Sequence, residues 1–313
     1  MKNAVILQRQ NIKMKLLVVG SGGREHSLCW ALSGSPLSEV IYCAPGNAGI
    51  AEVAECVDIS QDDIDSLVNF TKTNHIDFVI VGPEAPLVNG LVDRLNNVGV
   101  RCFGPTGSAA QLEGSKSFTK LLCEKYSIPT GSYRHFSQIE DARSYINERG
   151  APIVVKADGL AAGKGVSICN NIEEAKNKIK EIMEGKFKSS KKVVLEEFLE
   201  GEELSYFVIS DNNCYKFFGS AQDHKKVGEG DVGPNTGGMG AYSPSNLLND
   251  KLKNKIKKKI IEPTLKEMKN LGHPYTGFLY AGLMISNGEP YLIEYNIRTV
   301  SYTHLRAHET SLH

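Results

Sequence analysis

Several features that define whole classes of protein are missing from this sequence. Its 36 Lys and Arg residues are balanced by 36 Asp and Glu residues, so neither a strongly basic surface for nucleic acid nor a polybasic membrane patch is indicated. No apolar run is long enough to cross a membrane. The first residues lack the apolar core and small-residue cleavage site of a signal peptide. We therefore expect a protein that binds neither nucleic acid nor membranes.

Cysteine is present, but its spacing does not indicate a disulfide framework or a zinc site. The seven cysteines are an odd number, are widely scattered and include no CxxC pair. This distribution favours reduced, mostly buried thiols over disulfides or a zinc site. A cytoplasmic location is expected.

The first third of the chain alternates short apolar runs with helical patterns. At 313 residues the chain is long enough for about two domains. The expected strands are residues 15–20, 40–43, 78–81 and 100–103. The expected helices are residues 24–32, 64–74 and 88–97. Strands that alternate with helices predict an α/β fold with a doubly wound parallel sheet.

Glycine-rich turns follow three of these strands. Ligands of such sheets bind at the carboxyl ends of the strands, so the turns at 20–23 and 82–84 should line one crevice. The 20–23 turn matches only part of the GxGxxG dinucleotide pattern, because Glu25 stands where the third glycine would fall. A weak dinucleotide site and a purely structural turn both stay open.

A second glycine-rich loop follows the apolar run 153–155, which ends in Lys156. The loop contains Gly159, Gly163, Lys164 and Gly165. Backbone N–H groups in a loop with few side chains can approach an anion closely, and the two lysines add positive charge. The spacing is not that of a Walker A loop. The loop is therefore either a polyphosphate-binding loop or a flexible hairpin with solvated lysines.

The rest of the chain gives further elements and a first domain boundary at about Gly114. Helices are expected at 115–125, 138–148, 172–184 and 252–268, the last kinked by Pro263. Strands are expected at 152–156, 166–169, 193–198, 202–209, 277–286 and 290–295, the last two joined by a turn at Asn287 and Gly288. Residues 222–244 show no apolar period and are expected to form a long functional loop.

Acidic and amide side chains are paired on two of the expected strands. One strand carries Glu196 and Glu197. In another, Glu294 and Asn296 are two residues apart and so face the same side. Together they would present two oxygen ligands of the kind that Mg²⁺ prefers. Each residue alone could equally be an ordinary surface carboxylate or amide.

These motifs together resemble the ATP-grasp superfamily, and within it the glycinamide ribonucleotide synthetase (phosphoribosylamine–glycine ligase) family. The similarity spans residues 15–298 in the family's order. It is carried by GSGGREH (20–26), PGNAG (45–49), GPE (82–84), LEGSK (112–116), VVKADGLAAGKGV (154–166), QDHKK (222–226), GPNTGGMGAYSP (233–244), YTGFLYAGLM (275–284) and IEYNIR (293–298).

The resemblance implies an ATP-dependent carboxylate–amine ligase of purine biosynthesis. ATP would phosphorylate the carboxylate of glycine to give glycyl phosphate. The amine of 5-phosphoribosylamine would then attack, phosphate would leave, and an amide would form. Mg²⁺ or Mn²⁺ is the implied cofactor, ATP the co-substrate, and a monomer the expected state. Positioning, charge stabilisation and exclusion of water should supply most of the rate.

The resemblance also assigns roles to residues. Lys116, Lys156 and the loop with Gly159, Gly163, Lys164 and Gly165 would contact ATP phosphates. The hinge of Glu196, Glu197, Phe198 and Leu199 would bind adenine through its backbone, with Glu203 on the ribose. Glu294 and Asn296 would hold the metal. Arg298 and Asp223 would act at the anionic intermediate. Phosphoribosylamine would face Gly22, Gly23, Gly82, Pro83 and Glu84, and glycine would lie near Asn235, Thr236, Gly237 and Gly238.

The domain organisation that follows has four parts. Residues 1–13 are expected to be an extension, 14–113 an N-terminal substrate-binding α/β domain, and 114–298 an ATP-grasp domain whose lid spans about 129–193. After Arg298 the family continues with a further small domain, whereas residues 299–313 match nothing in it. We expect a truncated chain with an unrelated tail.

Three alternative functions stay open at this stage. The chain could be another ATP-grasp carboxylate–amine ligase, or an ATP-binding polypeptide without turnover because the last domain is missing. A nicotinamide-dependent oxidoreductase would rest on the 20–23 turn alone, and it would leave the motifs of the second half unexplained.

Overall fold

The computed structural model describes residues 13–161, 165–187, 191–229 and 232–298. Within them the N-terminal part is a five-stranded sheet in the order β3-β2-β1-β4-β5, with all pairs parallel. Its strands are β1 (Met14–Gly20), β2 (Ser38–Pro45), β3 (Glu55–Cys56), β4 (Phe78–Val81) and β5 (Arg101–Phe103). The predicted doubly wound α/β fold is confirmed. The short strand β3 is not among the expected ones, because its two exposed residues leave no apolar pattern.

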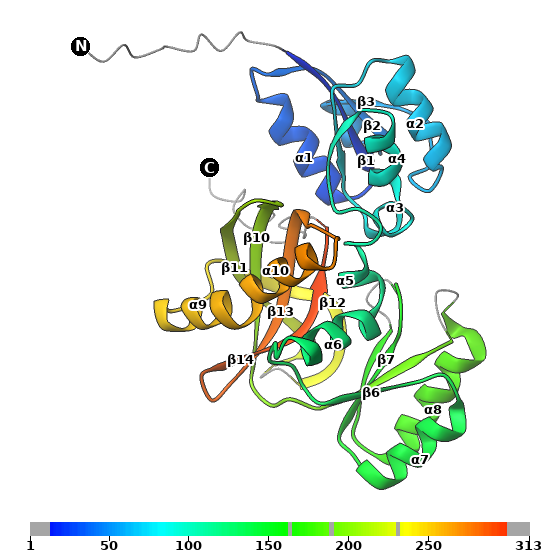
Figure 1. Ribbon diagram of the computed structural model, residues 1–313, viewed down its shortest axis with the longest axis vertical. Helices are drawn as coiled ribbons and strands as arrows, with labels where there is room; N and C mark the ends of the chain where they lie inside the picture. The colour runs from blue at the N-terminus through cyan, green and yellow to red at the C-terminus, as the bar shows by residue number, and fades with distance from the viewer. Residues whose placement is uncertain (1–12, 162–164, 188–190, 230–231, 299–313) are drawn as a thin grey trace.

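Helices cover both faces of this sheet, as the alternation along β1 requires. Leu16 and Val18 pack in a cluster with Cys29 of α1 (Gly23–Ser33). Leu17 and Val19 point to the other face, where Leu67 of α2 (Ile64–Thr73) belongs to the main core. Figure 1 shows α1 on one side of the strands and α2 on the other. The turns after β1 and β4 are thereby held on a rigid edge.

The expected helix at 88–97 is wrong in its bounds. The structure has α3 (Glu84–Val88) and then α4 (Leu91–Asn97), separated by Gly90. Gly90 has φ +83°, a left-handed conformation that ends one helix before the next begins. As a result Glu84 lies in the first turn of α3 and close to the end of β4.

A short connection leads from this sheet into the second half. It consists of α5 (Gln111–Gly114) and α6 (Lys116–Lys125). Ser115 caps α6, its hydroxyl accepting from the N–H of Phe118 at 3.1 Å. This cap fixes where α6 begins and therefore where Lys116 lies.

An antiparallel four-stranded sheet in the order β6-β9-β7-β8 follows. Its strands are β6 (Tyr133–Phe136), β7 (Ile153–Ala157), β8 (Val166–Cys169) and β9 (Val193–Glu197). The helices α7 (Ile139–Arg149) and α8 (Ile172–Glu181) close over it around a separate apolar cluster. The expected helix 172–184 is α-helical only to Glu181 and continues as the π-helical turn η2 (Ile182–Lys186).

A second antiparallel sheet has the order β12-β11-β10-β13-β14. Its strands are β10 (Glu202–Asp211), β11 (Tyr215–Gly228), β12 (Val232–Tyr242), β13 (Thr276–Ser286) and β14 (Glu289–Asn296). The predicted hairpin between β13 and β14 is confirmed, with Asn287 at φ +51° and Gly288 at φ +72°. β14 carries Glu294 and Asn296.

The prediction of a long loop at 222–244 is wrong, because most of this segment forms the antiparallel strand pair β11–β12. Gln222 pairs with Tyr242, Asp223 with Ala241 and His224 with Gly240. Backbone pairing needs no apolar alternation, and the register shifts on either side of Lys226 break the two-residue period further. A search for alternating apolar residues therefore misses this hairpin.

A helical stretch packs against the β10–β14 sheet. It runs through α9 (Asp250–Ile256), the π-helical turn η3 (Lys257–Ile261) and α10 (Glu262–Asn270). The distortion expected at Pro263 is thus taken up by the π turn directly before it, and Pro263 lies in the first turn of α10, where an N–H is not needed.

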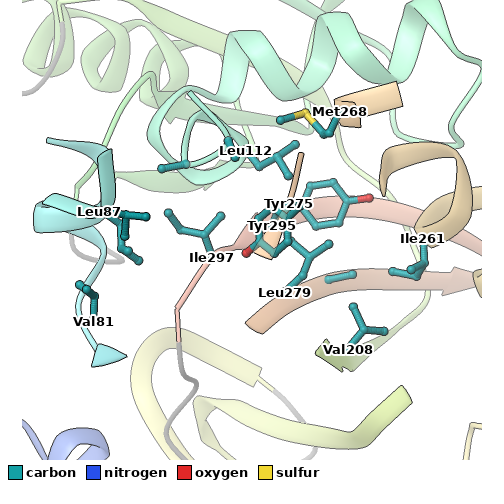
Figure 2. Packing of buried hydrophobic residues seen from close by; sticks show 14 of the residues in the cluster. Val81, Leu87, Leu112, Val208, Ile261, Met268, Tyr275, Leu279, Tyr295 and Ile297 are labelled. Carbon is teal, nitrogen blue, oxygen red and sulfur yellow. The ribbon is translucent and has the colours of Figure 1, made fainter. Parts of the chain in front are cut away.

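One apolar core joins the two halves of the chain. It extends from Val81 and Leu87 of the N-terminal part, through Leu112 and Ile297, to Met268 of α10. Figure 2 shows these side chains in one continuous layer. The core therefore fixes the N-terminal turns relative to the end of β14.

Candidate active site

A cavity of about 130 Å³ lies where α5, α6, β9 and β14 meet. Its lining contains an unusual share of charged side chains. The charged residues of the lining are Glu84, Glu113, Lys116, Lys120, Glu196, Glu294 and Arg298. The residues named here come from four parts of the sequence and converge on a space large enough for part of a small ligand. Two of the predicted groups, Lys116 and the Glu294–Asn296 pair, are brought together there.

Two residues of this lining, Lys120 and Glu196, form a buried cluster with Lys156, which is not itself among the lining residues. Lys156 Nζ lies 2.8 Å and Lys120 Nζ 3.0 Å from Oε2 of Glu196, and the three side chains are 3–7% exposed. Burial acts to raise the pKa of Glu196, but the two lysines outweigh it and hold the pKa below its ordinary value. Burial lowers the pKa of Lys120. Two cations on one anion leave a local excess of positive charge, as an anionic ligand requires.

The other carboxylate oxygen of Glu196, Oε1, is buried and has no hydrogen-bond partner among the residues that the structure describes. The expected contribution of Glu196 was its backbone at an adenine hinge. Its side chain instead fixes Lys156 and Lys120. The hinge role itself stays a prediction, because nothing in the geometry bears on it.

Lys120 is a site residue that sequence reasoning missed. Its Nζ also donates to Thr130 Oγ1 at 2.6 Å, and Thr130 in turn donates to the carbonyl of Leu292 on β14. A signal was present in the sequence: Lys120 is four residues after Lys116 on a predicted helix, so both side chains share one face.

Lys116 is held differently from the lysine pair. Its Nζ donates to the carbonyl of Gly159 at 2.9 Å. Asp158 Oδ1 accepts from the N–H of Ser117 at 3.2 Å, so the start of α6 and the start of the glycine loop are tied together. Burial lowers the pKa of Lys116. Gly163 and Lys164 lie outside the described residues, and Gly165 packs so closely that a Cβ there would lie 2.5 Å from Ala161 Cβ.

The end of β14 presents oxygen atoms and a guanidinium to the same cavity. Glu294, Asn296 and Arg298 all line it. A carboxylate and an amide oxygen on one side of a strand suit Mg²⁺, which keeps several waters or phosphate oxygens as further ligands. No group of three or more His, Cys, Asp or Glu that could hold a metal is found in the described parts of the chain. The two oxygen donors of Glu294 and Asn296 fit a metal that takes its remaining ligands from phosphates and water.

Arg298 is anchored by two carboxylates. Its Nε lies 3.0 Å from Glu84 Oε2 and 3.0 Å from Glu113 Oε1, and its Nη2 donates to Asn296 Oδ1 at 3.5 Å. Burial acts to lower the pKa of Arg298, but Glu113 and Glu84 outweigh it and raise the pKa. Glu113 is a second residue that the sequence analysis missed, although it lies within the LEGSK motif, three residues before Lys116.

The two N-terminal turns that were expected to line a crevice lie against the side chain of Glu25. This side chain is 2% exposed and accepts from the N–H of Gly22 at 2.7 Å. A Cβ on Gly82 would lie 2.0 Å from Glu25 Oε1, and one on Gly20 2.5 Å from Glu25 Cγ. The 20–23 and 82–84 turns are thus brought together as predicted. Glu84 reaches from this crevice to Arg298, so the crevice and the cavity are neighbours.

Other predicted residues are placed here by their backbone or by contacts outside the described lining of the cavity. Asp223, Asn235, Thr236, Gly237 and Gly238 belong to the β11–β12 pair. Glu197 Oε2 accepts from the N–H and hydroxyl of Ser132, at 3.1 and 2.8 Å. Glu203 lies on β10 opposite Met284, and Phe198 and Leu199 follow β9. Their roles stay predictions.

Comparison with known proteins identifies the family. A model of the N domain of phosphoribosylglycinamide synthetase matches residues 14–113, and a model of its ATP-grasp (A) domain matches residues 114–301. The chain belongs to the phosphoribosylglycinamide synthetase family. Among curated relatives, the phosphoribosylamine–glycine ligase of Brucella melitensis is 54% identical, with 91% of this chain and 67% of that protein covered. The enzyme of the same name from Escherichia coli O6:H1 is 49% identical, covering 91% and 68%.

Solved structures agree with this family assignment. The phosphoribosylamine–glycine ligase of Thermotoga maritima has a TM-score of 0.77 and 33% identity, covering 91% of this chain and 69% of its own. The biotin carboxylase domain of Hydrogenobacter thermophilus 2-oxoglutarate carboxylase, solved with MgADP, has a TM-score of 0.74 at 17% identity, which shows a shared fold. The fold is therefore an N-terminal parallel-sheet domain followed by an ATP-grasp domain. No helix in the described ranges is long and apolar enough to span a membrane.

Proposed function

We propose that this chain catalyses the ATP-dependent ligation of glycine to 5-phosphoribosylamine, giving glycinamide ribonucleotide, ADP and phosphate. Relatives of 49–54% identity carry the name of this reaction. The observation that supports it in this structure is that one cavity is lined by Lys116, Lys120, Glu196 and the Glu294–Asn296 pair, with Lys156 paired to Glu196. Such a site can hold a polyphosphate and a divalent cation beside each other.

The chemical steps require little covalent participation by the protein. The carboxylate of glycine attacks the γ-phosphorus of ATP, and ADP leaves with the electron pair of the broken bond. The amine of phosphoribosylamine then attacks the acyl carbon of glycyl phosphate, loses a proton, and expels phosphate. The protein's task is to orient the reactants, stabilise the spreading negative charge and exclude water that would hydrolyse the acyl phosphate.

The cationic side chains divide this task by position. Lys116 and Lys156 would hold the phosphates of ATP, and Arg298 would face the anionic glycine or acyl phosphate. Glu294 and Asn296 would hold Mg²⁺ or Mn²⁺, which supplies charge neutralisation on the transferred phosphoryl group when it is bound. The crevice at Gly22, Gly23 and the 82–84 turn would take phosphoribosylamine, since backbone N–H groups and small residues suit a phosphate there. Asp223 and the 235–238 segment would serve glycine.

The test is ADP release by the full chain, measured with ATP, Mg²⁺, glycine and freshly generated phosphoribosylamine, and with each substrate omitted in turn. Release that requires both glycine and phosphoribosylamine supports the proposal. Release that requires another carboxylate or amine would indicate a different ligase of the same superfamily. If the chain binds ATP but releases no ADP, it is a nucleotide-binding polypeptide without turnover.

A further inference from the structure

Glu113, the third residue of α5, connects two elements of the cavity that are distant in sequence. Its side chain is 10% exposed. Both of its carboxylate oxygens are engaged: Oε2 accepts from the N–H of Ile297 at 2.8 Å, and Oε1 accepts from Nε of Arg298 at 3.0 Å. The carboxylate therefore forms hydrogen bonds with two successive residues directly after β14.

The packing around Glu113 holds these hydrogen-bonded groups in fixed positions. Leu112, next to it on α5, is 2% exposed, and Ile297 is 1% exposed. Both belong to the core that joins the two halves of the chain, as Figure 2 shows. Only two residues lie between Glu113 and Lys116, so one short segment sets the place of Arg298 on β14 and of Lys116 on α6.

Glu84, the other carboxylate on Arg298, is a looser partner. Its side chain is 20% exposed, and it comes from the N-terminal crevice. It is also shared with Arg24, whose Nη2 lies 4.0 Å away. When an anion enters the cavity, Glu84 is the partner that can be exchanged for it, whereas Glu113 is held by the backbone of Ile297 as well.

We propose that Glu113 is a positioning residue, which fixes the guanidinium of Arg298 beside Asn296 at the cavity wall. Glu113 lines the cavity, but both of its carboxylate oxygens are used by Ile297 and Arg298, so it acts through Arg298 and not as a ligand of the substrate. Partners of this kind, one step behind the groups that meet a ligand or metal, hold those groups in the orientation that binding requires. The inference rests on the proposed function in taking the cavity as the nucleotide site.

The experiment is a double-mutant cycle on the full chain with Glu113→Gln, Arg298→Ala and the two together. Glutamine keeps one acceptor oxygen for the N–H of Ile297 and places an NH2 group where the other oxygen accepted from Arg298, so both the charge and the hydrogen bond that Arg298 faces are lost. Two quantities are measured: the affinity for ADP with Mg²⁺ by calorimetry, and kcat and KM of ligation. Asp93→Asn is the matched control, because that carboxylate also accepts a backbone N–H, from Gly107 at 2.7 Å, and is not among the residues that line the cavity.

The proposal expects Glu113→Gln to weaken Mg²⁺–ADP binding and lower kcat by about ten-fold. In the Arg298→Ala background the same substitution should have no further effect, and Asp93→Asn should change neither quantity. Equal effects of Glu113→Gln with and without Arg298, or no effect on either quantity, would overturn the proposal. If the unmodified chain shows no ligation, the proposed function fails, and the binding cycle alone decides the role of Glu113.

Discussion

The cavity and the neighbouring crevice hold their polar groups in opposite ways. In the cavity, charged side chains face one another, as in the buried Lys156–Glu196–Lys120 cluster. At the expected crevice, small residues predominate, and the backbone of the 20–23 and 82–84 turns closes on the carboxylate of Glu25. Under the proposed function, the first region would bind its ligand by charge, and the second by shape and backbone N–H groups. Substitutions should therefore act by different physical routes in the two regions.

The largest effect is expected when Lys156, a lysine of the buried cluster on Glu196, is removed. Lys156→Ala should weaken ADP binding by about 100-fold, because a buried charge-assisted hydrogen bond contributes roughly 1.5–3 kcal/mol. Calorimetric titration of ADP with Mg²⁺ measures this. The matched control is Lys176→Ala, a partly exposed lysine 3.3 Å from Glu173 on α8, which should bind ADP as the unmodified chain does. Equal affinities for all three proteins would remove Lys156 from the nucleotide site.

The second effect concerns stability in the same cluster. Glu196→Ala leaves two buried ammonium groups without their carboxylate, and breaking a buried pair in this way costs about 3–5 kcal/mol. The free energy of unfolding in urea should fall accordingly. Glu173→Ala, which removes a carboxylate that is 79% exposed, should unfold close to the urea concentration of the unmodified chain. A Glu196→Ala protein of unchanged stability would show that the cluster is not held by charge.

A third prediction tests the crevice through its lack of space. Gly82→Ala places a Cβ 2.0 Å from Glu25 Oε1, so the free energy of unfolding should fall by about 1–3 kcal/mol. Affinity for ADP should stay within about two-fold, since the clash is not in the cavity. Gly34→Ala is the control: a Cβ there meets its nearest atom at 3.7 Å. A loss of ADP affinity in Gly82→Ala without a loss of stability would mean that the two regions form a single site.

The smallest effect is a pH dependence of nucleotide binding. Burial lowers the pKa of Lys116, so this ammonium loses its proton at a lower pH than an ordinary lysine does. The charged form binds phosphate, and affinity should therefore fall as pH rises, by about three-fold between pH 7 and pH 9. Lys116→Arg, which stays protonated, should flatten the curve. A curve that is the same for both proteins would contradict the assignment.

The parts of the fold that could be predicted from the sequence are those specified locally. β4 follows from an uninterrupted apolar run, and the β13–β14 turn from Asn287 and Gly288. The β11–β12 pair is specified by backbone pairing between residues without an apolar period, so its pattern reads as a loop. The break at Gly90 was equally hidden, because a single glycine inside a helical pattern does not by itself end a helix.

The candidate site divides in the same way. Lys116, Glu294 and Asn296 carry their signal in local motifs and strand alternation, and the structure brings them to one cavity. The partnership of Glu196 with Lys156 and Lys120 and that of Glu113 with Arg298 join residues 40 to 185 positions apart. Such partners are chosen by tertiary packing, which no local pattern in the sequence records.

Whether the cavity is the nucleotide site can be decided by soaking crystals of the full chain with ADP and Mn²⁺ and recording the anomalous signal of manganese. The account predicts the diphosphate beside Lys116 and Lys156 and a manganese peak between Glu294 and Asn296. A nucleotide seated instead on the 20–23 turn, with no manganese at β14, would contradict it and would make the crevice, not the cavity, the nucleotide site.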